Sequence, residues 1–181
     1  MTTSFPIGDN EEARLSVLKE MSILDTLEEK KFDDITALAS KIFGVPTVAI
    51  SLLDETRQWF KSHHGLDVCQ TDRGVAFCNY TVTSDEILEI TDPEADERFK
   101  SNPLVTGDFK LRYYCGAPIV IKNQSIGALC LLDYVKRNPL PDDKKEILLG
   151  LARITADMIL HRHLLQKTTV LLVGSLNSTE D

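Results

Sequence analysis

The stretch YYCGAPIVIKNQSIGALCLLD, residues Tyr113–Asp133, decides the fold predicted for this chain. It indicates two β-strands, 113–121 and 125–132, joined by a tight polar turn at 122–124, because β-branched and aliphatic residues fill both arms around a short polar break. The apolar residues run consecutively instead of alternating with polar ones. A strand that is apolar on both faces needs cover on both faces, so we expect this hairpin at the centre of one sandwiched sheet.

Length, composition and charge fit a single domain. A chain of 181 residues with 43% hydrophobic and 27% charged residues is ordinary for a soluble globular protein. The net charge of -8 and the lack of a basic stripe argue against unaided binding to nucleic acid or to an anionic membrane. We expect no membrane span, no signal peptide and a cytoplasmic location, because apolar runs are short and the cysteines show no CxxC pairing.

Two helices are expected before the sheet and one after it. The first begins after Asp9, and the second follows Thr26 and ends at Gly44, according to capping and periodicity signals. The last, residues 141–166, carries two apolar stripes. Either one stripe covers the sheet and the other meets a second helix in a dimer, or both pack within one subunit. The stripes are Ile147, Leu151, Ile154, Met158, His161 and Leu165, and next to them Leu148, Ala152, Thr155 and Ile159.

Strands are expected at 47–54, 58–64 and 86–91, with a short helix at 77–82. The segment 92–110 shows no sustained period and contains two prolines and a glycine, which indicates a long connection. Connections of this length inside a compact domain often form lids or binding loops. This segment is therefore where we expect a pocket.

Four blocks of the chain resemble, in order and spacing, a GAF domain. They are FGVPTVAISLLDETRQWFKSHHGLD (43–67), RGVAFCNYTV (73–82), TDPEADERFKSNPLVTG (91–107) and the hairpin stretch itself. They are most similar to the GAF sensor modules on the N-terminal side of bacterial histidine kinases and of diguanylate cyclases or phosphodiesterases. The resemblance covers residues 10–166 as one domain, with 1–9 as a lead-in and 167–181 as a C-terminal tail.

The resemblance implies an α+β, PAS-related fold whose central antiparallel sheet has about five or six strands. The N- and C-terminal helices would pack on one face, and loops would enclose a small-molecule pocket on the other. It also implies a homodimer formed through these helices, which passes a signal to a partner protein. The small molecule is unidentified, with a cyclic nucleotide as one candidate. The sequence leaves any cofactor unknown and indicates no metal site.

Matching the blocks assigns a ligand site to the segment 77–106 and to the start of the central strand. In this site Arg98 would pair with a phosphate or carboxylate, or else form a salt bridge with Asp92 or Asp96 that pins the loop. Phe99 would be a loop anchor in the core or a base-stacking platform. The expected ligand-binding residues are Phe77, Cys78, Thr81, Asp92, Arg98, Phe99, Asn102, Tyr113 and Cys115.

One GAF branch, the free methionine-R-sulfoxide reductases, uses cysteines as nucleophile and resolving partner. A two-residue hairpin loop would place Cys115 and Cys130 on one sheet face, and a three-residue loop would separate them. We favour two small buried hydrophobes instead, and the glycine-flanked cysteine blocks of the reductases are not found around Cys69 or Cys78. We therefore expect a regulatory binding domain and no enzyme. The alternatives are a ligand-free dimerisation module and, less favoured, a reductase.

Overall fold

A six-stranded antiparallel sheet forms the middle layer of the protein in a computed structural model that describes residues 5–177, with side chains through residue 171. The strand order is β3-β2-β1-β6-β5-β4. This confirms the predicted α+β class and its central antiparallel sheet. The strands are β1 (Thr47–Leu53), β2 (Arg57–His64), β3 (Gln70–Asp72), β4 (Leu88–Ile90), β5 (Tyr113–Ile121) and β6 (Gln124–Asp133), of which β3 was not predicted.

The hairpin of β5 and β6 is central, because β6 also pairs with β1 along residues 47–52. Its turn has two residues, Lys122 and Asn123, both with positive φ (51° and 59°). This backbone matches the right-handed twist of the flanking strands, as in a type I′ turn. The predicted turn at 122–124 was one residue too long, since Gln124 pairs with Ile121 inside the ladder.

A β-bulge interrupts the same hairpin, where the register shifts between Ile119 and Val120. A shift of one residue moves every later side chain of a strand to the opposite face. Cys115 therefore joins the core beneath the long helices, whereas Cys130 faces the other side of the sheet. The shared face that a two-residue turn predicted for these cysteines was wrong, because the bulge cancels the turn's register.

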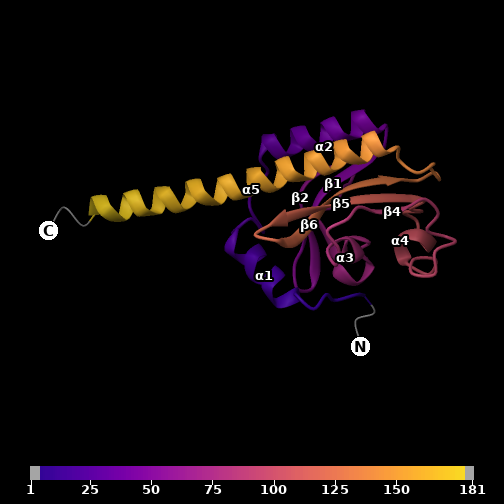
Figure 1. Cartoon of the computed structure of the whole chain (residues 1–181), viewed down its shortest axis with the longest axis horizontal. Helices are drawn as coiled ribbons and strands as arrows, with labels where there is room; N and C mark the ends of the chain where they lie inside the picture. Colours follow the sequence, from indigo (N-terminus) through magenta and orange to yellow (C-terminus); the bar gives the residue numbers. More distant parts are fainter. Residues whose placement is uncertain (1–4, 178–181) are drawn as a thin grey trace.

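The helices α2 (Lys30–Phe43) and α5 (Asp142–Asn177) lie side by side across one face of the sheet (Figure 1). Gly44 ends α2 in the left-handed conformation, with φ of 60°, which a glycine adopts without strain. The helix α1 (Glu11–Glu20) packs against β6 near the hairpin turn. The core beneath these helices includes Phe32, Ala39, Val48, Ile50, Trp59, Leu129, Leu131, Leu148, Ala152 and Ile159.

The helix α5 is longer than the sequence pattern predicted. The segment 167–177, expected as a tail, continues the helix, and residues 178–181 lie outside the described part of the chain. Figure 1 shows this end of α5 extending well past the sheet. The stripe that includes Leu148 and Ile159 is fully buried against the sheet, whereas Ile147 and Ile154 are 40% and 49% exposed.

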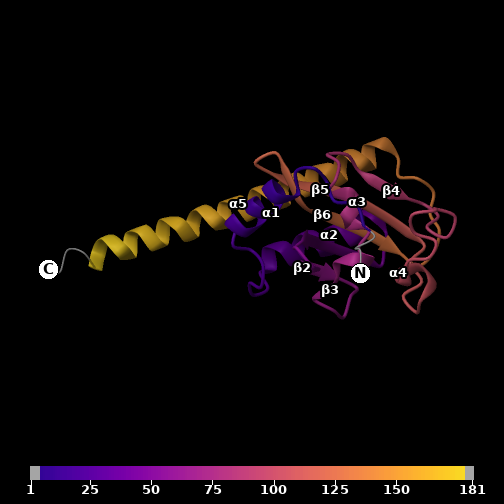
Figure 2. The same ribbon diagram turned by 90° about the horizontal axis from the view of Figure 1, so that it is seen from below.

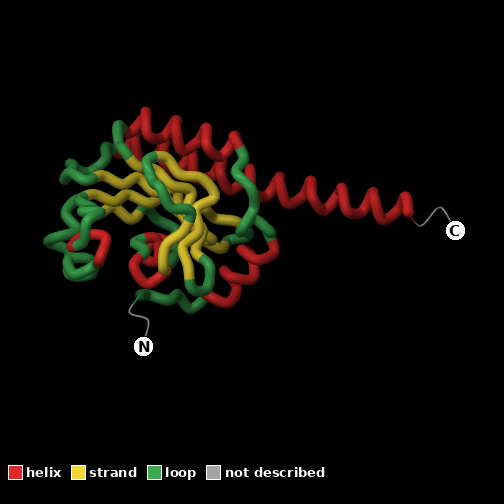
Figure 3. Tube along the Cα trace, turned by 180° about the vertical axis from the view of Figure 1, so that it is seen from behind, coloured by secondary structure: helices red, strands yellow, loops and turns green. Residues whose placement is uncertain are grey.

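The opposite face of the sheet is covered by short elements and loops, as expected (Figure 3). These are a 3-10 turn at Arg73–Val75 (η1), the helices α3 (Cys78–Thr81) and α4 (Pro103–Thr106), and the connection 92–110 that holds α4. The strands β3 and β4 are the two edge strands of the sheet, and in Figure 2 β3 lies low in the view and β4 at its upper right. A second apolar core fills it, with Leu53, Phe77, Phe99, Leu111, Tyr114 and Cys130 among its members.

Candidate functional site: an apolar cavity with a thiol pair

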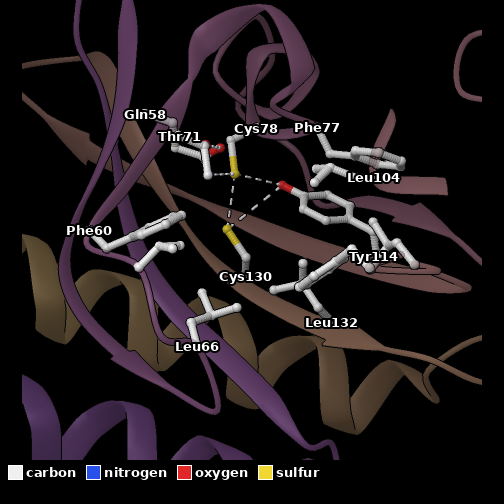
Figure 4. Close-up of a pocket in the computed structure, with 13 residues that line it drawn as sticks. Gln58, Phe60, Leu66, Thr71, Phe77, Cys78, Leu104, Tyr114, Cys130 and Leu132 are labelled. Atoms are coloured by element: carbon white, nitrogen blue, oxygen red, sulfur yellow. Dashed lines mark hydrogen bonds between the residues drawn. The ribbon is translucent and has the colours of Figure 1, made fainter. Parts of the chain in front are cut away.

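A cavity of about 200 Å³ lies between the sheet and its cover of loops, on the face opposite the long helices (Figure 4). Strands β2, β5 and β6 supply one wall, and α3 with the loop around α4 supplies the other. Most of the wall is apolar. The lining residues are Gln58, Phe60, Leu66, Val68, Thr71, Phe77, Cys78, Leu104, Phe109, Leu111, Tyr114, Cys130 and Leu132.

The size and polarity of the cavity limit what it can hold. An apolar protein cavity of about 150 Å³ accommodates benzene, so this one suits a compact ring or a short chain. None of the lining residues is an Asp, Glu, Lys or Arg. A phosphate held there would be buried without a counter-charge, which costs several kcal/mol. The cavity therefore fits an uncharged molecule better than a nucleotide.

The cavity reaches the surface between two segments of the cover. Val68 is 48% exposed, and Leu66, Leu104 and Phe109 are partly buried. These side chains come from the loop between β2 and β3 and from the loop around α4. Small shifts of exposed loops are the least costly motions of a folded chain, so these residues form the natural entrance.

Two thiols meet in the cavity wall. The Cys78 Sγ lies 3.0 Å from the Cys130 Sγ, and both residues are 1% exposed. The Gln58 amide donates a hydrogen bond to the Cys78 Sγ at 3.2 Å, and the Tyr114 hydroxyl donates another at 3.3 Å. Figure 4 shows the two sulfurs between the Tyr114 ring and Phe60. Three polar groups thus converge on the sulfur of Cys78.

This environment separates the acidities of the two thiols. Burial acts to raise the pKa of Cys78, but hydrogen bonds from Cys130, Ser51 and Tyr114 outweigh it, so the pKa lies below its ordinary value. Burial, followed by the neighbouring Cys78, raises the pKa of Cys130. Cys115 on the other face has its pKa raised by burial to about 12. Cys78 is therefore the favoured thiolate among these buried cysteines.

The Tyr114 hydroxyl is held in place by a hydrogen bond with a residue outside the cavity wall. It lies 2.7 Å from the Thr81 hydroxyl. A Cβ added to Gly116 would collide with the Tyr114 hydroxyl and approach Thr81, so only glycine leaves room for this contact. Burial raises the pKa of Tyr114 well above its usual range, which keeps the hydroxyl protonated and able to donate to the sulfur.

The structure brings two of the nine predicted site residues to the cavity, Phe77 and Cys78. Two other predicted residues do not line the cavity but contact residues that do. Thr81 supports Tyr114 as described, and the Phe99 ring stacks on Phe77 with centroids 3.9 Å apart. Phe99 is fully buried, which matches the core-anchor alternative for this residue.

Three predicted residues of the connection, Asp92, Arg98 and Asn102, lie outside the cavity. Arg98 forms an ion pair with Asp96 at 2.6 Å, which matches the loop-pinning alternative. Asp92 pairs with Lys136 at 2.7 Å. The Asn102 side chain accepts a hydrogen bond from the first turn of α4. These residues hold the loop in place around the site.

Tyr113 and Cys115, also predicted for the site, face the long helices. The Tyr113 hydroxyl donates to Glu89 at 2.9 Å, and Cys115 is fully buried in the helix-side core. Sequence reasoning missed Tyr114 and Cys130 because strand alternation groups residues without saying which group faces the pocket. The unpredicted bulge then decided that Cys130 shares the face of Tyr114 and not that of Cys115.

Within residues 5–177, no group of three or more His, Cys, Asp and Glu side chains is arranged to hold a metal ion. In the same described part of the chain, no helix has the length and apolar character needed to cross a membrane.

Known proteins share this architecture. Residues 28–159 match the family model of the GAF domain. A cyclic di-GMP phosphodiesterase of Pseudomonas aeruginosa is 34% identical over 164 residues, which are 90% of this chain but 27% of that protein. The chain thus spans about a quarter of the length of this curated relative.

Two solved structures show the same fold. The GAF domain of an Acinetobacter phosphoenolpyruvate-protein phosphotransferase superposes with a TM-score of 0.64 and 16% identity, covering 89% of this chain and 99% of that one. A free methionine-R-sulfoxide reductase of Neisseria meningitidis gives a TM-score of 0.60 and 15% identity, covering 90% and 96%. At these identities the likeness concerns the fold alone.

Proposed function

Because the chain belongs to the GAF domain family, we propose that it is a bacterial sensory module that binds a compact, uncharged and largely apolar molecule. The observation that carries this proposal is the cavity of about 200 Å³ with its uncharged lining. Ligand pockets are mostly apolar, with a few polar groups that fix orientation. Here Gln58, Thr71 and the Tyr114 hydroxyl supply those groups. The free cysteines support a reducing, cytoplasmic setting.

The substrate in the name of the Pseudomonas relative does not suit this cavity. Cyclic di-GMP carries two phosphates and two guanine bases, whereas the cavity is small and has no cationic side chain in its wall. The same argument applies to the cyclic mononucleotide considered from the sequence. We propose that this chain regulates an output activity and does not itself act on a nucleotide.

A free methionine sulfoxide reductase is less well supported, because the cavity wall has no charged side chain. Free methionine sulfoxide carries an ammonium and a carboxylate group, and both would need buried partners. The described lining residues offer no charged side chain to either group. The thiol pair alone therefore does not favour this substrate.

We further propose that α5 is the output of the module and pairs with a second copy. Ion pairs hold α5 against the rest of the domain as far as Lys167, whose Nζ lies 3.8 Å from a carboxylate oxygen of Glu20. Beyond that point Val170 and Leu171 are 71% and 74% exposed. Exposed apolar side chains on a long helix favour a partner helix. Ligand binding would act by favouring one of two helix arrangements.

The proposed dimer predicts that negative charges on the stripe of α5 that includes Ile154 and Leu165 weaken dimerisation. In the double variant Ile154→Glu with Leu165→Glu, four carboxylates would be brought together in the interface. We expect dimer dissociation to become at least about tenfold easier in sedimentation experiments, since charges left unpaired in an interface cost more than 1.4 kcal/mol. The control Arg153→Glu changes an exposed neighbour and is expected to leave the dimer intact. A wild type that sediments as a monomer contradicts the proposal.

If the protein binds such a ligand, we expect its Tm to rise in a thermal-shift screen of compact uncharged aromatic and aliphatic compounds. The screen is carried out with reductant present. At a hundred times its Kd, a ligand adds about 2.7 kcal/mol, or about 5–10 °C in Tm for a chain of this size. Leu132→Trp would fill the cavity from its wall and abolish the shift. Val135→Trp, at a position 62% exposed outside the cavity, should retain it. Equal shifts in both variants would place the binding elsewhere.

A further inference from the structure

The thiol pair in the cavity wall is more than a packing feature. The two sulfurs, from residues 52 positions apart, are 3.0 Å from each other. A disulfide has an S–S distance of about 2.05 Å, so an approach of about 1 Å would join them. Cys78 begins α3, a helix of four residues bordered by loops, which shifts more easily than the central strand that holds Cys130.

The surroundings give the two sulfurs different roles. The Gln58 amide and the Tyr114 hydroxyl both donate to Cys78, and such donors stabilise a thiolate. The Cys130 sulfur lies 3.5 Å from the Ala128 carbonyl oxygen, to which its thiol can donate. Cys78 is thus placed as the nucleophile and Cys130 as the thiol that resolves the product.

We propose that Cys78 and Cys130 form an oxidant-responsive dithiol that a small hydroperoxide entering the cavity closes to a disulfide. Hydrogen peroxide and short alkyl hydroperoxides are compact and uncharged, which suits a small cavity whose wall contains no Asp, Glu, Lys or Arg. Val68, which is 48% exposed, lines the same cavity as the two cysteines. Cytosolic disulfides, where they occur, are usually transient and redox-sensing.

The reaction balances in two steps. The Cys78 thiolate attacks the terminal oxygen of the hydroperoxide: an S–O bond forms, the O–O bond breaks, and the leaving alkoxide takes the proton that the thiol gave up. Cys130 then attacks the Cys78 sulfur of the sulfenic acid, and the S–O bond breaks to release water with the Cys130 proton. Two thiols and one hydroperoxide become one disulfide, one alcohol and one water. A cellular thiol can reverse the step by exchange.

Oxidation would change the wall that a ligand meets. Closing the disulfide ties up the Cys78 sulfur that accepts these hydrogen bonds, so the Tyr114 hydroxyl and the Gln58 amide each lose one partner while keeping Thr81 and Ser51. This inference does not rest on the ligand-binding proposal, because it needs only the cavity and the thiols. The ligand screen uses reduced protein, so the two proposals fail independently.

The first test counts thiols in the wild-type full chain. Reduced protein is treated with hydrogen peroxide, freed of it, denatured and labelled with a maleimide. We expect the 4 thiols to fall to 2, a mass loss of two hydrogens in the unlabelled fraction, and one cross-linked peptide pair that joins Cys78 to Cys130. Retention of all 4 thiols, or a cross-link that involves other cysteines instead, overturns the proposal.

Variants assign the roles. Cys130→Ser should leave a sulfenic acid on Cys78 that dimedone traps, and Cys78→Ser should leave Cys130 reduced. Cys115→Ser is the matched control, because Cys115 is equally buried in the same sheet but on the other face, and it should still form the disulfide. Dimedone labelling at Cys130 in place of Cys78 would overturn the assignment. These measurements follow the thiols directly, so the wild-type count decides the matter even where a variant fails to fold.

Discussion

Replacing Gly127 by alanine is expected to destabilise the protein by about 3 kcal/mol or more. Gly127 lies in β6, where it pairs with Leu52 of β1 on one side and with Ile119 of β5 on the other. An added Cβ would collide with the Ser51 carbonyl oxygen and touch Leu52. The obstacle is backbone in the middle of a ladder, so relief requires β1 and β6 to separate and to lose hydrogen bonds.

Urea unfolding of the purified protein measures this effect as a lower midpoint. The control is Gly150→Ala in α5, where the nearest atom to an added Cβ is the Arg153 guanidinium at 3.9 Å. Alanine in a helix interior is expected to add about 0.5–1 kcal/mol of stability. If Gly127→Ala unfolds at the wild-type midpoint, the close approach of β1 and β6 at this site is refuted.

Replacing Glu11 by glutamine is expected to cost about 2–3 kcal/mol at neutral pH. The Glu11 carboxylate accepts hydrogen bonds from the Arg14 guanidinium at 2.8 and 2.9 Å and from Arg73 at 2.7 Å. The side chains of Arg14 and Arg73 are only 1% and 3% exposed. Without the carboxylate, two buried cations face each other unneutralised, and such losses cost about 3–5 kcal/mol. We expect less because Glu11 itself retains 18% exposure.

The same cluster makes stability depend on pH. Burial acts to raise the pKa of Glu11, but hydrogen bonds from Arg14 and Arg73 lower it from 4.5 to about 2. A carboxyl whose pKa is lower in the folded state stabilises the protein fully above its unfolded pKa. That contribution is lost as the pH falls through the window from about 5 to 2. We therefore expect wild-type stability to decline across this window and the decline to be shallower in Glu11→Gln.

Chemical denaturation at several pH values measures both slopes. Glu12→Gln is the control, because Glu12 is an exposed neighbour on the same helix, and it should follow the wild type. Burial acts to raise the pKa of Glu29, but hydrogen bonds from Lys61 and Arg162 lower it to about 2. Glu29 therefore preserves part of the dependence of stability on pH in Glu11→Gln. Identical slopes for wild type and Glu11→Gln would show that the arginine cluster does not hold an ionised carboxylate.

The longer elements and the family follow from the sequence by itself, whereas the 3-residue strand β3 was not predicted. Consecutive apolar residues in 113–133 predicted a central hairpin, and the 3–4 spacing with Gly44 as a stop predicted α2, because both signals are local. The order of four sequence blocks predicted the GAF fold and a pocket between the sheet and the segment 77–106. Periodicity also identified the two apolar stripes of α5 without saying which one faces the sheet, and the helix runs past its predicted end.

The composition of the site was decided only by the tertiary structure. A bulge near Ile119 places Cys115 and Cys130 on opposite faces of the sheet, and the local residue pattern did not predict it. The meeting of Cys78 with Cys130 depends on α3 folding back over β6 across 52 residues of chain. Local patterns record which residues are apolar and how they repeat. The register between strands, and hence the side chains that share a cavity, is fixed by packing across the whole sheet.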